Sequence, residues 1–293
     1  MTELPPRVKL IRKLVETGHS ILYLVGHPDY ERPLLLKQLH PDLAYDPIEN
    51  DYLYREFKIG KMLDLANVPK VYAYGEEGGL PYILMEYVDG EDLFTRWHLR
   101  SPKTEELLRT VCRVAEILDE VHRHGIVHRD VKPENIIIDP QGEPWLVDFG
   151  LALRRDLTPP SHEKGHFVGT LPYAAPERLK EFTPDPDPRA DVYSIGVLLH
   201  LALTGKVPFG DLETEDFFLG KTSISAPPIE PLRRDLPGEI AGNQAIRAVH
   251  DRALDPDPRK RFPHALAVAW ALELALRSAE APPERGSATQ DKE

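Results

Sequence analysis

The chain has 293 residues, with 36 lysine and arginine residues against 48 aspartate and glutamate residues and a net charge of −12. This length suits one large or two-lobed domain with a substantial core. The acidic balance argues against nucleic-acid and membrane-surface partners, because both attract basic surfaces. Cys112 is the single cysteine, which excludes a disulfide framework and favours a reducing, cytoplasmic location. The longest nearly apolar runs, 192–203 and 265–276, are too short to span a bilayer.

The first part of the chain favours a β-sheet with one helix. Apolar and β-branched runs indicate strands within 7–39, at 20–25 and 33–39. Residues 48–65 place Leu53, Phe57 and Leu63 on one helical face. Two more strands are predicted around a Glu-Glu-Gly-Gly turn, at 69–74 and 81–88.

The remainder favours helices. Ser101 followed by Pro102 predicts a helix start, and apolar residues at spacings of four and three predict one helix face that ends at Gly125. Cys112 lies next to this face and is expected to be packed rather than reactive. Two short strands are then predicted at 135–139 and 144–147, followed by an aperiodic loop at 150–168. Further helices are predicted near 175 and at 191–204, 239–254 and 263–277, and a disordered tail at 278–293.

The densest chemical signal is the segment HRDVKPEN at 128–135, followed 13 residues later by DFG at 148–150. Asp130 is suited to accept a hydroxyl proton. Asn135 and Asp148 offer the hard oxygen ligands that Mg²⁺ takes when phosphates complete its shell. Lys132 is suited to neutralise charge on a transferring phosphoryl group. His122 and His124 are predicted to lie at a solvated helix end rather than in a metal site.

These motifs resemble the catalytic and metal-binding loops of eukaryotic-like (Hanks-type) protein kinases, and the Ala-, Arg-, Pro- and Leu-rich style resembles bacterial members. The resemblance runs from about residue 7 to 277. It includes GT at 169–170 and YAAPE at 173–177 as the end of the activation segment, DVYSIG at 191–196 as the helix that anchors the catalytic loop, and MEYV at 85–88 as the hinge beside adenine.

The resemblance implies an α+β, bilobal protein kinase fold. The kinase domain would cover 1–277, with a small β-rich N-lobe of one main helix at about 7–87 and a larger helical C-lobe at about 88–277. ATP and Mg²⁺ (or Mn²⁺) would bind between the lobes. The implied activity is transfer of the γ-phosphoryl group to Ser or Thr hydroxyls of a protein substrate, because lysine stands at position 132 in a KPEN context.

The resemblance also implies roles for single residues. Asp130 would be the catalytic base, Lys132 would contact the γ-phosphate, and Asn135 and Asp148 would hold the metal. Arg261 would pair with Glu177 in a buried structural ion pair. The residues implied to bind the nucleotide are Val15, Gly18, Leu22, Lys37, Glu56, Met85, Glu86, Val88 and Asp148; for Met85, plain core packing is an open alternative.

The phosphate-binding loop departs from the family pattern. Val15, Thr17 and Ser20 replace the expected glycines, and Gly18 is the only glycine left. Because glycines let backbone N–H groups approach phosphates, we expect a looser grip on ATP. An alternative reading is therefore a pseudokinase or nucleotide-binding interaction module with weak or no transfer. A kinase for small molecules is a third reading, disfavoured by Lys132 and the long activation segment.

The activation segment offers two regulatory interpretations. In the family, the arginine at the position of Arg129 pairs with a phosphate on this segment. Thr158 and Ser161 are the hydroxyl residues between Gly150 and 169, and autophosphorylation at one of them is expected, with possible self-association. Glu163 could instead supply a permanent negative charge to Arg129.

Overall fold

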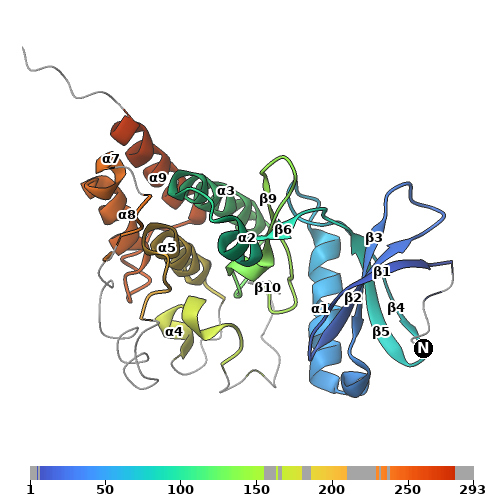
Figure 1. Ribbon diagram of the computed structural model, residues 1–293. Helices are drawn as coiled ribbons and strands as arrows, with labels where there is room; N and C mark the ends of the chain where they lie inside the picture. Colours follow the sequence, from blue (N-terminus) through green and yellow to red (C-terminus); the bar gives the residue numbers. More distant parts are fainter. Residues whose placement is uncertain are drawn as a thin grey trace, which may run out of the picture.

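The structure is a computed structural model that describes residues 5, 7–154, 163, 167–179, 186–209, 229–230, 232–235 and 238–280. A small lobe of strands and one long helix adjoins a larger, mainly helical lobe, as Figure 1 shows. The expected α+β, two-lobed architecture is confirmed. Thr158 and Ser161 lie outside the described residues.

The small lobe is built on an antiparallel sheet with the strand order β1-β2-β3-β5-β4. Its outer strand β1 is exposed along almost its whole length, whereas β2 and β3 are largely buried. The strands span Lys9–Glu16 (β1), Ser20–Gly26 (β2), Leu34–Leu39 (β3), Val71–Glu77 (β4) and Leu80–Glu86 (β5).

Helix α1 (Pro47–Met62) lies between β3 and β4 in the chain, after a short 3-10 turn at Pro41–Leu43. Its start is fixed by Asp46, whose side chain accepts hydrogen bonds from the N–H groups of Ile48 and Glu49. Leu53 of α1 packs with Ile83 and Met85 in a cluster between the helix and one face of the sheet. The helix therefore has a defined position above that face.

The opposite face of the sheet has its own apolar cluster, which includes Tyr23, Val25, Leu36 and Leu84. The alternation of β3 explains both clusters, because successive side chains point to opposite faces. Lys37 pairs with Leu22 on β2 and with Ile83 on β5, so its side chain lies on the face of the sheet that α1 covers.

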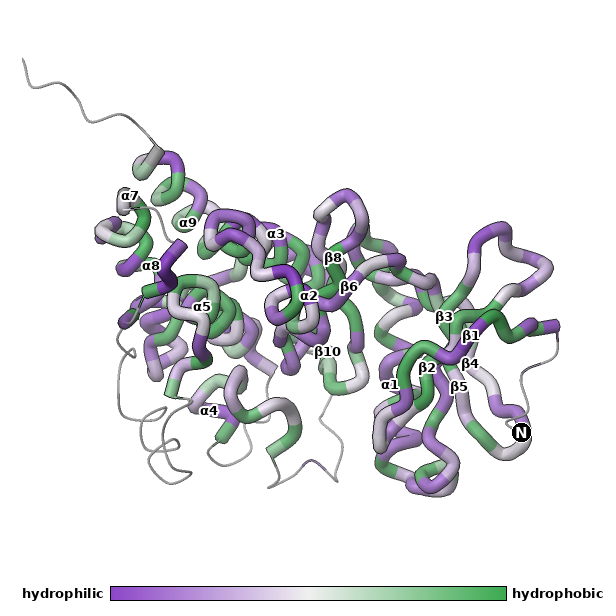
Figure 2. The backbone as a smooth tube through the Cα atoms, in the orientation of Figure 1, coloured by the Kyte–Doolittle hydropathy of each residue, from purple (hydrophilic) through white to green (hydrophobic). Residues whose placement is uncertain are grey.

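The larger lobe continues with β6 (Glu91–Asp92) and a set of helices and short strands. Figure 2 shows hydrophobic residues along much of α5, which is almost entirely buried. Helix α5 packs against α3 and α8, and α9 packs against α3. The remaining elements are α2 (Leu93–Arg100), α3 (Thr104–Arg123), β7 (Ile126–Val127), a 3-10 turn (Pro133–Asn135), β8 (Ile136–Ile138), β9 (Pro144–Leu146), β10 (Leu153–Arg154), a second 3-10 turn (Leu171–Tyr173), α4 (Pro176–Leu179), α5 (Arg189–Thr204), α7 (Gly238–Ala241), α8 (Gln244–Ala253) and α9 (Ala265–Glu280).

The helix α3 confirms the predicted apolar face and the stop at Gly125, which has a left-handed φ of 74°. Cys112 on this helix is 3% exposed, as expected for a packed residue. Burial raises the pKa of its thiol to about 12, and nearby acidic side chains, Glu273 first, add to the rise. The thiol is therefore protonated and unreactive at neutral pH.

The predicted helix start at Ser101 is wrong. Ser101 has a left-handed φ of 45° and ends α2, a helix that the sequence patterns missed. Helix α3 begins at Thr104, and its N-terminal cap comes from a distant residue: the Thr104 N–H and hydroxyl both donate to Asp235 Oδ2, at 2.8 and 3.0 Å. A cap supplied over 131 residues leaves no local signal.

Two further predictions need correction. The helix predicted at 239–254 is two helices, α7 and α8, because Asn243 caps a new start with its side chain. The disordered tail was predicted from residue 278, but α9 continues to Glu280. Residues 281–293 lie outside the described part of the chain.

Candidate active site

Three charged side chains meet where the two lobes adjoin. Lys37 comes from β3, Glu56 from α1, and Asp148 from the loop after β9. The Lys37 Nζ donates to Glu56 Oε2 at 2.7 Å and to Asp148 Oδ1 at 3.3 Å. The expected ion pair between Lys37 and Glu56 is therefore confirmed, and Asp148 shares the same ammonium group.

Burial alone would lower the pKa of Lys37, but the carboxylates of Asp148 and Glu56 outweigh it and raise that pKa. Burial would likewise raise the pKa of Asp148, yet Lys37 and the Gly150 N–H lower it overall. Both groups are therefore charged at neutral pH, which a site for a phosphate and a cation requires.

Asp148 adopts an unusual backbone conformation, with a φ of 64°. Aspartate tolerates this left-handed region better than most residues. Its Oδ1 also accepts the Gly150 N–H at 3.3 Å, which turns the carboxylate toward Lys37. The neighbouring Phe149 is buried and packs against the His128 ring, with centroids 4.8 Å apart.

The second cluster belongs to the loop between β7 and β8. Asp130 Oδ1 accepts the Thr170 N–H at 3.0 Å, and its Oδ2 lies 3.1 Å from Asn135 Nδ2 and 2.9 Å from Lys132 Nζ. Lys132 also donates to the Thr170 hydroxyl at 2.8 Å. The Asp130 carboxylate is thus held on both oxygens: Lys132 and Asn135 of its own loop contact one, and the Thr170 N–H contacts the other.

The loop that carries Asp130 is fastened by Asp191 at the start of α5. Asp191 Oδ2 accepts the His128 N–H at 2.8 Å, and Oδ1 accepts the Arg129 N–H at 2.9 Å. His122 Nε2 lies 2.8 Å from Asp191 Oδ2, and its side chain is only 7% exposed. The prediction of a solvated His122 is wrong, because α5 covers the end of α3; no local pattern signals this contact.

Two of the residues expected to bind the nucleotide, Val15 and Leu22, lie in the same row across the sheet as Lys37. Val15 pairs with Leu22, which pairs with Lys37. Met85 is 7% exposed and packs with Leu53 under α1, which fits the packing interpretation. Glu86 and Val88 follow at the end of β5, where the chain crosses to the larger lobe.

The loop between β1 and β2 is closed by Thr17. Its hydroxyl oxygen accepts the N–H groups of His19 and Ser20, at 3.2 and 3.0 Å, and donates to the Ser20 carbonyl at 3.1 Å. His19 Nδ1 lies 3.1 Å from Glu49 of α1, which holds the loop toward that helix. None of the residues from Val15 to Ser20 has a positive φ. The hydroxyl of Thr17 therefore occupies two N–H groups of the loop that is expected to bind phosphate.

We expect Thr17→Gly to strengthen Mg-ATP binding several-fold, because it frees the N–H groups of His19 and Ser20. Thr17→Val should act in the same direction, because it removes the hydroxyl and keeps the branched shape. Thr17→Ser, which keeps the hydroxyl, is the matched control and should bind as the wild type. Titration calorimetry with a non-hydrolysable analogue measures this, and unchanged or weaker binding in both Gly and Val variants would contradict it.

Comparison with known proteins decides the family. The protein kinase domain family matches residues 12–270, which is most of the chain. The chain belongs to the protein kinase family. The matched residues include Lys37, Asp130 and Asp148.

The similar proteins are bacterial serine/threonine-protein kinases. The kinase is 32% identical over 286 residues to PknL of Mycobacterium tuberculosis, which covers 94% of the chain and 68% of PknL. It is 34% identical over 254 residues to PknB of Mycolicibacterium smegmatis, covering 84% of the chain and 39% of PknB. A probable serine/threonine-protein kinase of Bifidobacterium longum, pknA2, is 34% identical over 209 residues, or 69% of the chain and 27% of that protein. The kinase thus spans between about a quarter and two thirds of these relatives. Among the described residues, no helix is long and apolar enough to cross a membrane.

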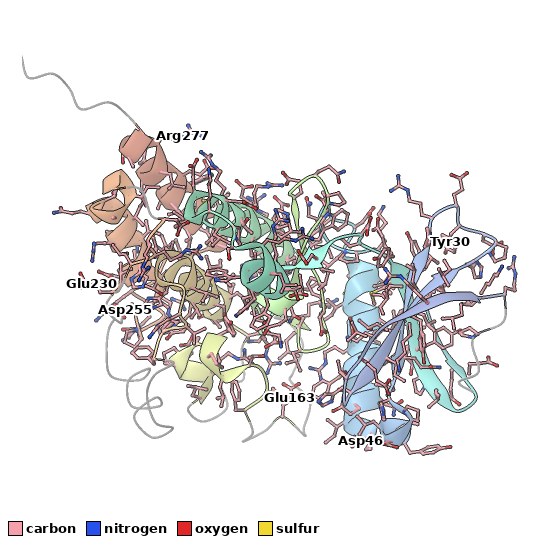
Figure 3. The ribbon with its side chains drawn as sticks, viewed as in Figure 1. Tyr30, Asp46, Glu163, Glu230, Asp255 and Arg277 are labelled. Carbon is pink, nitrogen blue, oxygen red and sulfur yellow. The ribbon has the colours of Figure 1, made fainter. Side chains whose placement is uncertain are left out.

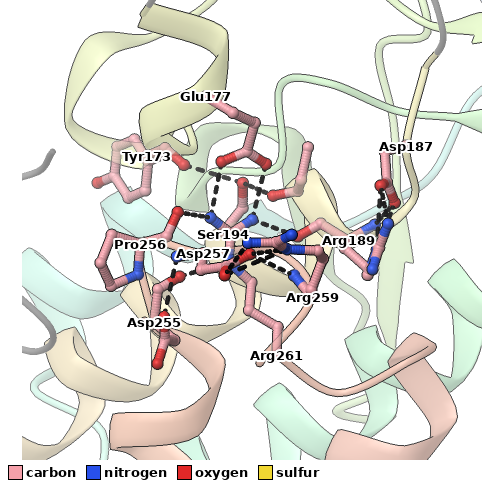
Figure 4. Close-up of polar contacts among 11 residues, drawn as sticks. Tyr173, Glu177, Asp187, Arg189, Ser194, Asp255, Pro256, Asp257, Arg259 and Arg261 are labelled. Carbon is pink, nitrogen blue, oxygen red and sulfur yellow. Dashed lines mark hydrogen bonds and ion pairs between the residues drawn. The ribbon is translucent and has the colours of Figure 1, made fainter.

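The ion pair expected between Glu177 and Arg261 of the kinase is confirmed. Figure 4 shows Arg261 facing Glu177. Its Nη1 and Nη2 donate to the two carboxylate oxygens of Glu177, each at 2.7 Å. Arg261 also donates to the Arg189 and Asp255 carbonyls, at 2.9 and 2.7 Å, and its guanidinium lies over the Tyr193 ring. The pair fastens the end of the activation segment to the core of the larger lobe.

We expect Arg261→Ala to lower the free energy of unfolding by about 3–5 kcal/mol, because it leaves Glu177 and three backbone carbonyls without their buried donor. The matched control is Arg259→Ala, two residues earlier. The Arg259 side chain is 81% exposed and pairs with Asp257, so its loss should change the free energy of unfolding far less than the loss of Arg261. Urea unfolding followed by circular dichroism measures both, and equal effects would rule out the buried pair as the cause.

Proposed function

We propose that this kinase transfers the γ-phosphoryl group of ATP to Ser or Thr hydroxyls of a protein substrate. The observation that carries the proposal is the position of Lys37 Nζ, 2.7 Å from Glu56 and 3.3 Å from Asp148. Protein kinases are active when the strand lysine pairs with the helix glutamate and the DFG aspartate is in place. The contacts of Lys37 with Glu56 and Asp148 support this proposal.

In this proposal Lys37 binds the α- and β-phosphates, and Glu56 keeps its ammonium group in position. Asn135 and Asp148 hold the metal, and their oxygen donors suit Mg²⁺ or Mn²⁺. The fit is supported by the Asn135 amide nitrogen, which donates to Asp130 at 3.1 Å and so leaves the amide oxygen for a cation. When bound there, Mg²⁺ would offset the negative charge of the nucleotide phosphates.

The acceptor hydroxyl would bind beside Asp130, which orients it and accepts its proton as the oxygen bonds to the γ-phosphorus. The bond from that phosphorus to the bridging oxygen breaks, and ADP leaves. Lys132 lies 2.9 Å from Asp130 and offsets the negative charge on the transferring group. Its contact with Thr170 places the end of the activation segment beside the acceptor, which supports a peptide acceptor over a small molecule.

The remaining roles follow from position. Val15, Leu22 and Val88 would line the adenine site, with Glu86 offering backbone groups, Met85 forming the rear wall and Gly18 at the tip of the phosphate-binding loop. The net charge of −12 favours protein over nucleic-acid partners. We also propose a cytoplasmic location, where ATP is available, and self-association in any autophosphorylation. The comparisons give the pseudokinase reading no support.

The test is transfer of labelled phosphate from ATP to a generic acceptor such as casein, with Mg²⁺ and then with Mn²⁺. Hydrolysis of the product should yield phosphoserine or phosphothreonine. Nucleotide binding without transfer would favour the interaction module, and phosphotyrosine as the sole product would contradict the acceptor class.

A further inference from the structure

Glu163 is a buried carboxylate between the two lobes. Figure 3 labels it beside the lower part of helix α1, and the residue is 1% exposed. Its Oε1 accepts a hydrogen bond from Arg55 Nη1 at 2.6 Å, and its Oε2 accepts one from Arg129 Nη2 at 2.9 Å. Each carboxylate oxygen therefore holds one guanidinium group.

The two arginines belong to different parts of the active site. Arg129 directly precedes Asp130, and its Nη1 donates to the Leu151 carbonyl at 3.2 Å, just beyond the DFG segment. Arg55 directly precedes Glu56 on α1. Through these two neighbours, Glu163 connects the loop that carries Asp130 to the helix that positions Lys37.

The charges make this connection depend on Glu163. Two guanidinium groups face one site and would repel each other without an anion between them. Burial alone would raise the pKa of Glu163, but Arg129 and Arg55 outweigh it and lower that pKa, so the carboxylate is ionised. A phosphorylated side chain would bring about −1.5 to −2 charges to such a pair of arginines. A glutamate at this position brings one negative charge that is present without any phosphorylation.

We propose that Glu163 is a positioning residue that takes the place of an activating phosphate: it holds Arg129 and Arg55 together, so the kinase is active without phosphorylation of its activation segment. This inference rests on the proposed kinase function. It decides between the two regulatory interpretations in favour of the permanent charge, and any phosphate on Thr158 or Ser161 is then dispensable for activity.

The first test leaves Glu163 untouched. Wild-type protein is treated with a phosphatase until intact mass shows no phosphate, and its initial rates are compared with untreated protein and with the Thr158→Ala/Ser161→Ala variant. We expect all three to have the same kcat. A loss of activity on dephosphorylation, or in the double variant, would overturn the inference while leaving the kinase function established.

The second test removes the charge. Glu163→Gln is expected to lower kcat by about 10- to 100-fold, through misplacement of Asp130 and Glu56, with a smaller change in KM for the acceptor. Glu163→Asp should recover part of the loss. In combination with Arg129→Gln, Glu163→Gln should add little further loss, because both remove the same contact.

The matched control is Asp51→Asn. Asp51 also pairs with Arg55, at 2.8 Å, but it lies one turn earlier on the same helix and its side chain is 44% exposed. We expect it to keep wild-type kcat. Hydrogen exchange on the unliganded proteins should show faster exchange along α1 in Glu163→Gln than in Asp51→Asn.

That exchange measurement is independent of transfer, so it separates the two claims. Absence of transfer in every variant together with faster α1 exchange in Glu163→Gln would defeat the proposed function and keep the bridge. Unchanged exchange, or wild-type kcat in a folded Glu163→Gln variant, would defeat the bridge.

Discussion

Asp148→Asn is expected to remove nearly all phosphoryl transfer, by at least about 10²–10³-fold, while the protein stays folded. The substitution keeps the shape of the side chain but removes the charge that faces Lys37 at 3.3 Å and that is proposed to hold Mg²⁺. Asparagine also tolerates the left-handed φ of 64° at this position, so we expect no backbone strain.

The measurement is the initial rate of labelled-phosphate transfer at several Mg²⁺ concentrations, together with thermal denaturation. The control is Asp42→Asn, which removes a small-lobe carboxylate whose side chain is 88% exposed. The control should retain wild-type rate and stability. Full activity of Asp148→Asn with an ordinary dependence on Mg²⁺ would refute the metal role.

Asp130→Asn is expected to lower kcat by about 10²–10⁴-fold, the usual range for loss of a positioned acid–base group. Both oxygens of Asp130 face donors: the Thr170 N–H at one, and Lys132 and Asn135 at the other. An amide NH₂ must therefore oppose a donor in either orientation. The acceptor site should lose its alignment as well as its base.

The nucleotide site should be unaffected by this second change, because Lys37 and Glu56 are held by β3 and α1. Calorimetry with a non-hydrolysable analogue should give a Kd for Mg-ATP close to the wild-type value. A wild-type kcat would contradict the role of Asp130. A large loss of nucleotide affinity would instead indicate that the catalytic loop had collapsed.

Much of the fold could be predicted because it depends on local patterns. The apolar spacing of α3 and the alternation of β3 are visible in a short window. Strand β3 lies where predicted, and α3 has the predicted apolar face and end. The family motifs also keep their order along the chain, so the partners Lys37 and Glu56, and Glu177 and Arg261, could be named before their distances were known.

The missed features depend on contacts between distant residues. Ser101 has the composition of a helix start, yet Asp235 caps α3 and Ser101 ends α2. His122 lies at a helix end that would be solvated in isolation, but α5 covers it and Asp191 binds it. In both cases a long-range hydrogen bond overrides the local preference.

The divergent phosphate-binding loop shows a third kind of limit. The missing glycines can be read from the sequence, and they predict weaker ATP binding because glycines let backbone N–H groups approach phosphates. The loop has no positive φ, and the hydroxyl of Thr17 occupies two of its N–H groups. The expected direction of the effect stays a prediction, and the structure suggests a competing hydrogen bond as its physical cause.

The central claim is that Asn135 and Asp148 together hold the metal of the bound nucleotide in front of Lys37. A crystal structure with Mn²⁺ and a non-hydrolysable ATP analogue, with the metal located by its anomalous scattering, tests it most directly. The account predicts one metal bound by the Asp148 carboxylate, the Asn135 amide oxygen and phosphate oxygens. A metal bound by other side chains, with Asn135 and Asp148 too far apart to share it, would contradict the account.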